Sequence, residues 1–473
     1  MKKFIALFLC MIMIFSLTAC GSNNIETPKE TPSTTGVSNT PEPSGETKKG
    51  DPVYINENAA SLTGTVRFLT AFDGQFGTNA LIEEFNKYYP NVKVEYTVYK
   101  NSTEGNLTAD TSILADEVDV ILSFGTNNTA TRWENGLLLD ITDNLAKDNL
   151  DLVTEWGTDA YTYEDRVYCF PSGGLSVFVA INMDMWKAAG LGDIPKEWTW
   201  DEYIEACRAM TQRDNAGKTL VYGGSDFNQR DYWTYALRQT KGVDAFYNAE
   251  GKADFGSPLS ATILNRQLNA EKEGVWYKKM DLITDGTKSR DMLWAGTVGS
   301  CVESIITRFV MDTANYPHDF VLGYAPYPIN AKGETNYTLG NMPNSFFAVT
   351  NSAQDPEAAY AFAKFASTIG SKYLYKAGHT STWTGVKADE IVNLVFGSRE
   401  TAEKYVDVDS YIANVLAVGA PAYHEEYIVA YNAIASLVDE YTDYILSGEM
   451  SVEDGLVKLN ELANDAIEEK LSE

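Results

Sequence analysis

The spacing of apolar residues predicts a regular series of strands and helices near the start of the folded chain. Residues 66–69 favour a short strand, and apolar residues then recur at helical spacing over 81–88 until Pro90 ends the pattern. Residues 92–98 alternate as in a half-buried strand, whereas 118–124 are apolar almost throughout, as in a strand buried on both faces. This order of strands and helices predicts an α/β fold with a largely parallel sheet.

Helix signals also occur farther along the chain. Thr199 and Glu202 have the spacing of a capping box, in which each side chain bonds the other residue's backbone. Pro356 suits the first position of a helix, and an alanine-rich segment follows it. Residues 427–446 and 451–471 show helical spacing, so we expect the C-terminal region to be helical.

The first twenty residues carry a different pattern, two lysines followed by an apolar run from 4 to 15. This pattern is typical of a secretory signal peptide, and the run is too short for a comfortable transmembrane span. The sequence LTAC at 17–20 resembles the bacterial lipoprotein signal, which implies removal of residues 1–19 and acylation of Cys20. A plain cleaved signal, with Cys20 incidental, is the alternative.

The next segment, residues 20–50, is rich in Thr, Pro, Ser, Glu, Asn and Gly. Because it holds almost no large aliphatic side chains, it cannot bury a core, and we expect a disordered tether. The folded body then begins near Asp51 and spans about 420 residues, a length that suggests two or three structural units.

Acidic residues outnumber basic ones, 66 against 37. A mature chain without Lys2 and Lys3 would carry 35 basic and 66 acidic residues, a formal charge of −31. This charge argues against nucleic acid as a partner. It also repels anionic lipid, so a lipid on Cys20, rather than electrostatic attraction, would have to hold the protein at a membrane.

The sequence offers few groups for metal or nucleophilic chemistry. Cys169, Cys207 and Cys301 are widely spaced, which predicts buried thiols and no disulfide framework. The three histidines lack zinc-ligand spacing, and the P-loop, nucleophile elbow and dinucleotide fingerprint are missing. We therefore expect no cofactor, no metal site and no enzymatic activity. A surface glycosidase stays an alternative, because 66 acidic residues guarantee neighbouring carboxylates by chance.

Aromatic side chains are abundant, with 28 Tyr, 20 Phe and 9 Trp. Flat rings stack on the C–H faces of sugars, while neighbouring amides hydrogen-bond sugar hydroxyls. Core packing is the ordinary role of such a ring. Trp and Tyr residues inside polar or glycine-rich loops are nevertheless candidates for ligand contact, because such loops rarely enter a core.

Five segments stand out in a fixed order: FNKYYPNVKV at 85–94, VDVI at 118–121, GLLLDITD at 136–143, DRVYCFP at 165–171 and, as the most specific of them, INMDMWKAAGL at 181–191. In this order they resemble the sugar-binding group of solute-binding proteins of bacterial ABC importers. The resemblance covers nearly the whole folded body. One segment departs from it: AGTVGSCVES at 295–304 has no Trp following closely, which makes Glu303 a candidate acceptor in place of a stacking ring.

The resemblance implies two α/β lobes, each a mostly parallel sheet flanked by helices, with a ligand cleft between them that closes by hinge motion. The implied first lobe comprises residues 51–177 and 346–385, and the second comprises 178–345 and 386–473. Crossings between the lobes are expected near 175–178, 344–347 and 384–387.

Ligands of open α/β sheets meet the loops at the carboxyl ends of strands, and this rule selects the candidate cleft residues within the lobes. They are Phe72, Asp73, Gln75, Ser123 and Asn127 from the first lobe and Asp226, Trp233 and Glu303 from the second. Asn341, Asn344 and Trp383 are candidates because they precede or meet the expected crossings, and the resemblance implies a further cleft aromatic near Tyr423 and His424. Trp383 is the best stacking candidate. Asp73 equally suits a turn cap, and Tyr423 equally suits the apolar face of the next helix.

These observations lead to one expected function, an extracellular receptor anchored to the membrane by an N-terminal lipid. The receptor captures a mono- or oligosaccharide by stacking and hydrogen bonding and delivers it to the permease subunits of an ABC transporter. We expect a monomer. A non-sugar solute is the alternative, and charge discriminates between the two: Asp73, Asp226 and Glu303 clustered in the cleft would favour a cation, whereas scattered carboxylates would favour a neutral sugar.

Overall fold

The computed structural model describes residues 51–158, 161–226, 232–417 and 419–472. The elements in these ranges gather around two main sheets, and three two-stranded sheets accompany them. The expected signal peptide, Cys20 and the tether lie outside the described residues. We call the elements around the larger sheet the first lobe and those around the smaller sheet the second lobe.

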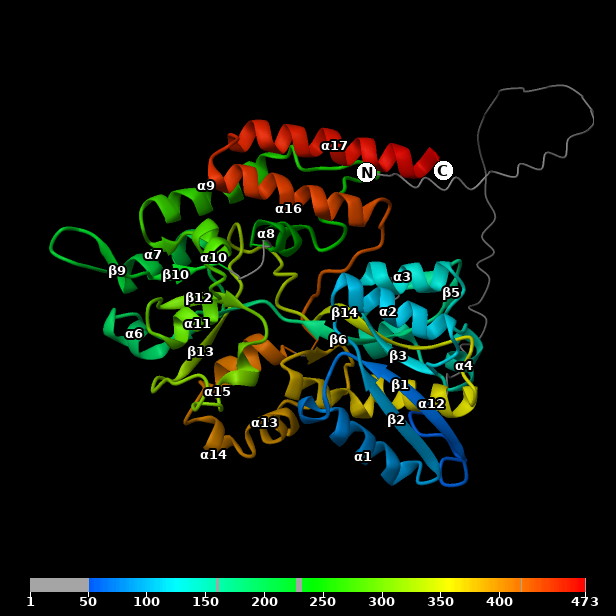
Figure 1. Ribbon diagram of the computed structural model, residues 1–473. Helices are drawn as coiled ribbons and strands as arrows, with labels where there is room; N and C mark the ends of the chain where they lie inside the picture. Colours follow the sequence, from blue (N-terminus) through cyan, green and yellow to red (C-terminus); the bar gives the residue numbers. More distant parts are fainter. Residues whose placement is uncertain (1–50, 159–160, 227–231, 418, 473) are drawn as a thin grey trace, which may run out of the picture. The chain divides into compact units, whose positions relative to one another are not determined.

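The larger sheet has six described strands in the order β15-β6-β14-β3-β1-β2 (Figure 1). Their bounds are β1 (Gly64–Thr70), β2 (Val92–Val98), β3 (Val120–Phe124), β6 (Phe170–Leu175), β14 (Met342–Val349) and β15 (Thr380–Ser381). The strands predicted at 66–69, 92–98 and 118–124 are thus confirmed as β1, β2 and β3. As predicted, β1 pairs in parallel with both β2 and β3.

Helices cover both faces of the larger sheet: α1 (Thr78–Tyr88) and α12 (Pro356–Ser367) lie on one face, and α2 (Thr103–Leu114) and α3 (Thr126–Glu134) lie on the other (Figure 1). Phe362 of α12 meets the rings of Phe68 and Phe85 edge-on at 5.0 and 5.2 Å, so sheet and helices share one core. Short elements complete the lobe: η1 (Gly74–Phe76), α4 (Thr142–Lys147), α5 (Leu152–Trp156), β4 (Thr162–Tyr163), β5 (Arg166–Val167) and η3 (Ile369–Ala377).

The smaller sheet has the order β12-β7-β13, with bounds β7 (Phe178–Asn182), β12 (Ser300–Glu303) and β13 (Leu322–Pro326). The longer helices of the second lobe are α7 (Trp200–Met210), α8 (Tyr232–Lys241), α9 (Pro258–Lys272), α13 (Ala388–Phe396), α16 (Tyr431–Ser447) and α17 (Val452–Ser472). Its shorter elements are α6 (Met183–Ala188), β8 (Gln212–Arg213), β9 (Thr219–Val221), β10 (Gly224–Ser225), β11 (Trp276–Tyr277), α10 (Lys279–Asp285), α11 (Ser289–Trp294), η2 (Ile306–Phe309), α14 (Arg399–Ala402), α15 (Val408–Tyr411) and η4 (Ile412–Leu416). The capping box predicted at Thr199 and Glu202 is confirmed at the start of α7.

The strand directions correct one part of the predicted fold. The lobes are α/β as predicted, but β14 pairs antiparallel with β3 and β6, and both pairs of the smaller sheet are antiparallel. Parallel neighbours need a crossover helix between them, as β1, β2 and β3 have. Strands β6, β7, β13 and β14 instead carry the chain between the lobes, so their directions are not set by crossover helices.

The first C-terminal helix also begins later than predicted, at Tyr431 instead of residue 427. The backbone amides of Glu426 and Tyr427 both donate to Oδ1 of Asp244, at 2.7 and 3.0 Å. Because this carboxylate satisfies them, no helical turn is needed there. Ala430 then takes a left-handed conformation, with φ of 57°, immediately before the helix.

Three segments carry the chain between the two sheets. The first joins β6 to β7 through Ser176, within the expected range, and the third lies between β15 and α13. The second lies between Pro326 and Met342, earlier than expected, because Ser345–Phe347 already pair with β3. The lobe boundaries at single-residue precision stay a prediction.

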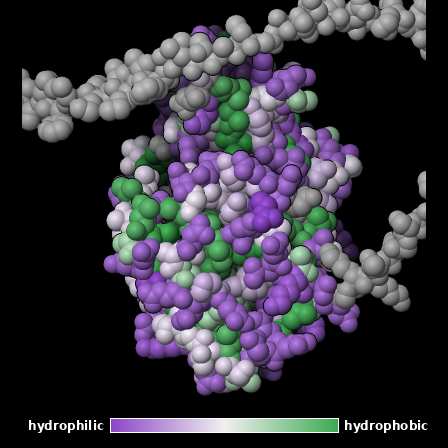
Figure 2. All heavy atoms as spheres, turned by 90° about the vertical axis from the view of Figure 1, so that its right-hand side faces the viewer, coloured by the Kyte–Doolittle hydropathy of each residue, from purple (hydrophilic) through white to green (hydrophobic). Residues whose placement is uncertain are grey.

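Polar residues predominate on the face of the molecule seen in Figure 2, with separate small apolar patches among them. Leu107 and Leu114 of α2 are among the more exposed apolar side chains, at 69% and 70%. Among the described residues, no helix combines the length and apolar character needed to cross a bilayer.

Candidate functional site

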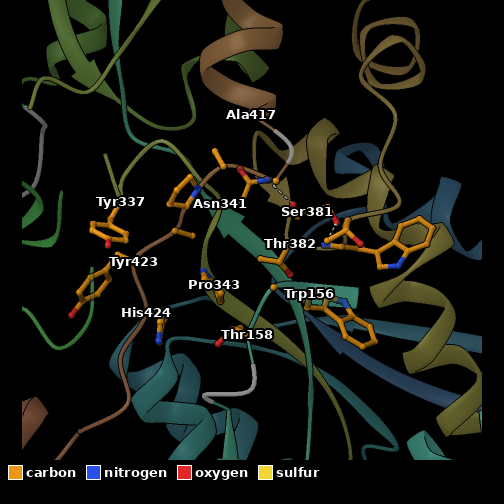
Figure 3. A pocket seen from close by; sticks show the side chains of 17 residues that line it. Trp156, Thr158, Tyr337, Asn341, Pro343, Ser381, Thr382, Ala417, Tyr423 and His424 are labelled. Atoms are coloured by element: carbon orange, nitrogen blue, oxygen red, sulfur yellow. Dashed lines mark hydrogen bonds between the residues drawn. The ribbon is translucent and has the colours of Figure 1, made fainter. Parts of the chain in front are cut away.

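Two adjoining cavities lie between the lobes, where the crossing segments meet residue 417 and the C-terminal segment 419–425. The first has a volume of about 400 Å³ and the second of about 200 Å³. Pro343, Tyr423 and His424 line both, so the two cavities adjoin at these residues. We refer to them as the first and second cavities. Figure 3 shows the first cavity, with side chains converging on it from both lobes.

Asn341 lines the first cavity and is fixed by two hydrogen bonds. Its Nδ2 donates to the backbone oxygen of Ser381 at 2.7 Å, and its Oδ1 accepts from Oγ of Ser176 at 2.8 Å (Figure 3). Ser381 and Thr382 line the same cavity beside it. The amide and hydroxyl groups here are held in place before any ligand arrives, which favours specific hydrogen bonding.

Aromatic rings form much of the remaining surface of the first cavity. Trp383 donates its indole Nε1–H to Oε2 of Glu155 at 3.0 Å, and Trp156 donates its indole N–H to the backbone oxygen of Ser367 at 3.1 Å. Tyr337 and Tyr423 stand on the opposite side (Figure 3). Each tryptophan thus has its polar edge satisfied by the protein. Trp156 is almost fully buried, whereas Trp383 is the more exposed of the two rings.

The second cavity is lined by a charge pair and several tyrosines. Nη2 of Arg238 lies 3.8 Å from Oε1 of Glu425, and both side chains are mostly buried, with 15% and 12% exposed. Tyr431 bridges them: its hydroxyl donates to Glu425 and accepts from Arg238 Nη2 at 3.1 Å. The guanidinium also lies over the rings of Tyr235 and Tyr423, at 4.9 and 5.5 Å. Arg238 is therefore a fixed internal cation.

Burial changes the titration of this pair. The pKa of Glu425 is raised because burial disfavours the charged carboxylate, although the Arg238 guanidinium and the Tyr431 hydroxyl act in the opposite direction. Burial and the Glu425 carboxylate both raise the pKa of Tyr431, which keeps its hydroxyl protonated as a donor. The pair thus places a hydrogen-bond donor and an acceptor side by side at the cavity.

The sequence of residues 76–372 matches the family profile of bacterial extracellular solute-binding proteins. The chain belongs to this family. The match spans more than half of the chain and covers elements of both lobes.

Solved structures of other solute-binding proteins share the fold at low sequence identity. A sugar transporter from Rhizobium etli in an open conformation is 20% identical with a TM-score of 0.67, and covers 84% of this chain and 98% of its own. An ABC substrate-binding protein from Listeria monocytogenes in complex with cycloalternan is 18% identical with a TM-score of 0.64, over 86% and 99% of the two chains. The maltose-bound MalE3 of T. maritima is 18% identical with a TM-score of 0.62, over 85% and 99%. No curated protein matches the sequence.

Among the residues predicted for the ligand site of this solute-binding protein, six line the two cavities. Trp383 and Asn341 line the first, Asn127 and Asn344 line the second, and Tyr423 and His424 line both. Oδ1 of Asn344 is buried without a hydrogen-bond partner among the described residues, so it is an unused acceptor in the second cavity. The hydroxyl of Tyr423 accepts from the backbone amide of Ala245 at 3.0 Å.

The three ligand-site candidates in the loop after the first strand lie outside both cavities. Asp73 is exposed and accepts from the backbone amide of Gly74 at 2.6 Å, which is the turn-capping role weighed for it above. Gln75 is exposed. Phe72 packs against the rings of Phe124 and His379 at 5.4 and 5.0 Å.

Four other predicted residues are buried inside a lobe and bonded there. Ser123 accepts from Arg132 Nη1 at 2.5 Å, and Trp233 donates to Thr442 Oγ1 at 2.8 Å. Asp226 lies 3.2 Å from Nζ of Lys279, and Glu303 lies 2.9 Å from Nη1 of Arg290. The roles of these four residues toward a ligand stay a prediction. The carboxylates of Asp73, Asp226 and Glu303 do not cluster at the cavities.

Several cavity residues were not predicted from the sequence: Trp156, Thr158, Tyr161, Tyr235, Arg238, Tyr337, Thr382, Glu425 and Tyr431. Trp156 precedes Gly157, so the criterion of a ring beside a glycine-rich loop would have found it. Arg238 sits inside α8, where nothing in the sequence separates it from an ordinary surface arginine.

No group of three or more His, Cys, Asp or Glu side chains among the described residues has the arrangement of a metal site. The described thiols of Cys169, Cys207 and Cys301 are all free and buried.

Proposed function

We propose that this solute-binding protein is a lipid-anchored extracellular receptor that captures a neutral carbohydrate in the two cavities and delivers it to an ABC permease. One observation carries the carbohydrate assignment. The cavities combine aromatic rings with amides and hydroxyls. Among the described lining residues, Arg238 is the one arginine or lysine and Glu425 the one carboxylate, and these two are paired with each other.

This lining suits a sugar for two reasons. The rings of Trp156, Trp383, Tyr337 and Tyr423 present apolar faces to the C–H surfaces of pyranose rings. The amide of Asn341 and the neighbouring hydroxyls supply directional hydrogen bonds. The cavity volumes, about 400 and 200 Å³, lie in the range of small-molecule sites.

The distribution of charge argues against a cationic solute. Asp73 faces solvent, whereas Asp226 and Glu303 pair with Lys279 and Arg290 inside the second lobe. Glu425 is the one carboxylate among the described lining residues, and Arg238 neutralises it. A glycosidase needs two carboxylates across the scissile bond, so this lining also supports binding without turnover.

The comparisons support the same reading at the level of the family. Structures with this fold include a complex with cycloalternan and one with maltose, both of which are built from sugar units. The proposed lipid anchor rests on the LTAC sequence at 17–20, and delivery to a permease rests on membership of the solute-binding family.

Isothermal titration calorimetry against glucose, maltose, maltotriose and cycloalternan, with putrescine and a tripeptide as non-sugar solutes, tests the ligand class. We expect at least one saccharide to bind. Thin-layer chromatography of the sample after the titration should show that this saccharide has not been hydrolysed. Binding of the amine or peptide alone would overturn the carbohydrate assignment.

Cys20→Ala tests the anchor separately: labelled palmitate should be incorporated into the wild-type chain and not into the variant.

A further inference from the structure

Glu155 of α5 is a buried carboxylate that contacts the cleft tryptophan without lining the cleft itself. It is 5% exposed. Its Oε2 accepts two hydrogen bonds, from indole Nε1 of Trp383 at 3.0 Å and from the hydroxyl of Tyr54 at 2.7 Å. Within the described part of the chain, neither Glu155 nor Tyr54 lines the first or the second cavity. The two side-chain hydrogen bonds of the Glu155 carboxylate therefore connect it to the first cavity through the indole of Trp383.

The indole of Trp383 is held from several directions. The ring of Tyr54 meets it edge-on, with centroids 5.3 Å apart and an interplanar angle of 79°. The backbone amide of Trp383 donates to Oγ of Ser381 at 3.0 Å, and the next amide, of Thr384, donates to the backbone oxygen of Glu155 at 2.9 Å. Side chain and backbone are thus both tied to α5.

Tyr54 is itself fixed, because the segment 53–56 is bonded to the first lobe on both sides of it. The amide of Val53 donates to the backbone oxygen of Asp148 at 2.8 Å, and the amide of Asn56 donates to the hydroxyl of Tyr89 at 2.9 Å. The buried ammonium of Lys364 donates to the backbone oxygen of Val53 at 2.9 Å and to Oδ1 of Asn56 at 2.7 Å. The segment is therefore part of the scaffold.

We infer that Glu155 and Tyr54 are positioning residues for the ligand site: they hold the indole of Trp383 in the orientation that stacks on the bound sugar. A hydrogen bond to an ionised carboxylate is stronger and more directional than one to a neutral acceptor. Fixing the ring before binding removes part of the entropy that ordering it would otherwise require. The ligand part of this inference rests on the proposed carbohydrate function, whereas the orientation of the indole does not.

The orientation is tested without any ligand, by NMR of protein labelled with ¹⁵N-tryptophan. Trp383→Phe assigns the indole N–H signal of Trp383. Glu155→Gln should move that signal upfield and speed its exchange with water, and Tyr54→Phe should give a smaller change in the same direction. The exposed Glu83 supplies the matched control, Glu83→Gln, which should leave the signal in place. An unchanged signal in folded Glu155→Gln overturns the inference.

The consequence for binding is tested by a double-mutant cycle with maltotriose as the probe. Glu155→Gln should weaken binding by about two- to tenfold, the range that immobilising one side chain contributes. In the Trp383→Ala background the same change should have no further effect, because Glu155 acts through the indole. An equal loss in both backgrounds would show that Glu155 acts by another route. If no saccharide binds the wild type, the proposed function fails, while the NMR result still decides the positioning.

Discussion

The side chains of Ser176 and Asn341, which lie on different crossings between the lobes, are hydrogen-bonded to one another. Oγ of Ser176 donates to Oδ1 of Asn341 at 2.8 Å and lies 2.9 Å from the backbone oxygen of Val415. Because Nδ2 of Asn341 also donates to the backbone oxygen of Ser381 at 2.7 Å, one amide links the first two crossings to the end of β15, after which the third crossing begins. Asn341 thus ties these segments together at the edge of the first cavity.

We predict that Asn341→Asp destabilises the protein by about 1 to 3 kcal/mol, because the carboxylate cannot donate to the Ser381 oxygen and leaves that acceptor unpaired. Thermal unfolding in the absence of sugar measures the effect. The exposed Asn393 on α13 provides the matched control, and Asn393→Asp should leave the midpoint almost unchanged. Equal midpoints for the two variants would contradict the role assigned to Asn341.

Trp383→Ala should weaken saccharide binding by about 1 to 3 kcal/mol, since it removes an indole face proposed for stacking. Calorimetry with the saccharide that binds the wild type measures the loss. Tyr88→Ala is the control, because Tyr88 is an exposed ring, 39% accessible, on α1 and outside both cavities. Unchanged affinity in Trp383→Ala would assign that ring to packing alone.

The sequence predicted local structure better than it predicted the site. The strand at 92–98 and the helix that begins at Pro356 were predictable because apolar spacing and helix-start signals depend only on residues close together in the sequence. Whether a polar side chain faces the cleft depends on partners far away in the chain. Glu303 is paired by Arg290, and Asp226 by Lys279, and no local pattern in the sequence reveals those pairings.

The strand-end rule nonetheless led to part of the cleft lining. Asn127 lies in the helix that follows β3, where the rule places a ligand. Trp383 is instead a candidate because it precedes the third crossing. The rule has no means of finding Arg238, because α8 brings it to the cleft from inside a helix. It also depends on parallel strands, and the antiparallel strands of the second lobe do not meet that condition.

Glu271 should make stability fall as pH rises. Burial raises its pKa to about 7, although the side chain of Gln267 and the backbone amide of Lys279 donate to its Oε1. A carboxyl group with a raised folded-state pKa stabilises the protein below its unfolded pKa, near 4.5, and this contribution is lost as pH rises through about 7. The loss is on the order of 3 kcal/mol.

Denaturant unfolding from pH 4.5 to 8 of the wild type and of Glu271→Gln measures this contribution. The variant should gain stability relative to the wild type as pH rises. The comparison is needed because burial lowers the pKa of His379 to about 4, which makes stability fall toward acid in an overlapping range and partly hides the effect. Parallel curves for the two proteins would show that Glu271 does not titrate in this range.

The pair of Arg238 and Glu425 allows stability and recognition to be separated. Arg238→Met leaves a buried carboxylate without its cation, and we expect a loss of about 3 to 5 kcal/mol in the free energy of unfolding. Adding Glu425→Gln removes that charge and keeps an acceptor for the Tyr431 hydroxyl, so the double variant should recover at least half of the stability.

Saccharide affinity should not recover in the same double variant, because the donor and acceptor that the pair presents to the second cavity are both changed. Urea unfolding measures the first quantity and calorimetry the second. Recovery of both stability and affinity would show that the pair serves folding alone. Recovery of neither would mean that packing of the Arg238 side-chain stem, and not its charge, stabilises this part of the cleft. Recovery of stability without affinity is the outcome expected if the second cavity reads sugar hydroxyls through this pair.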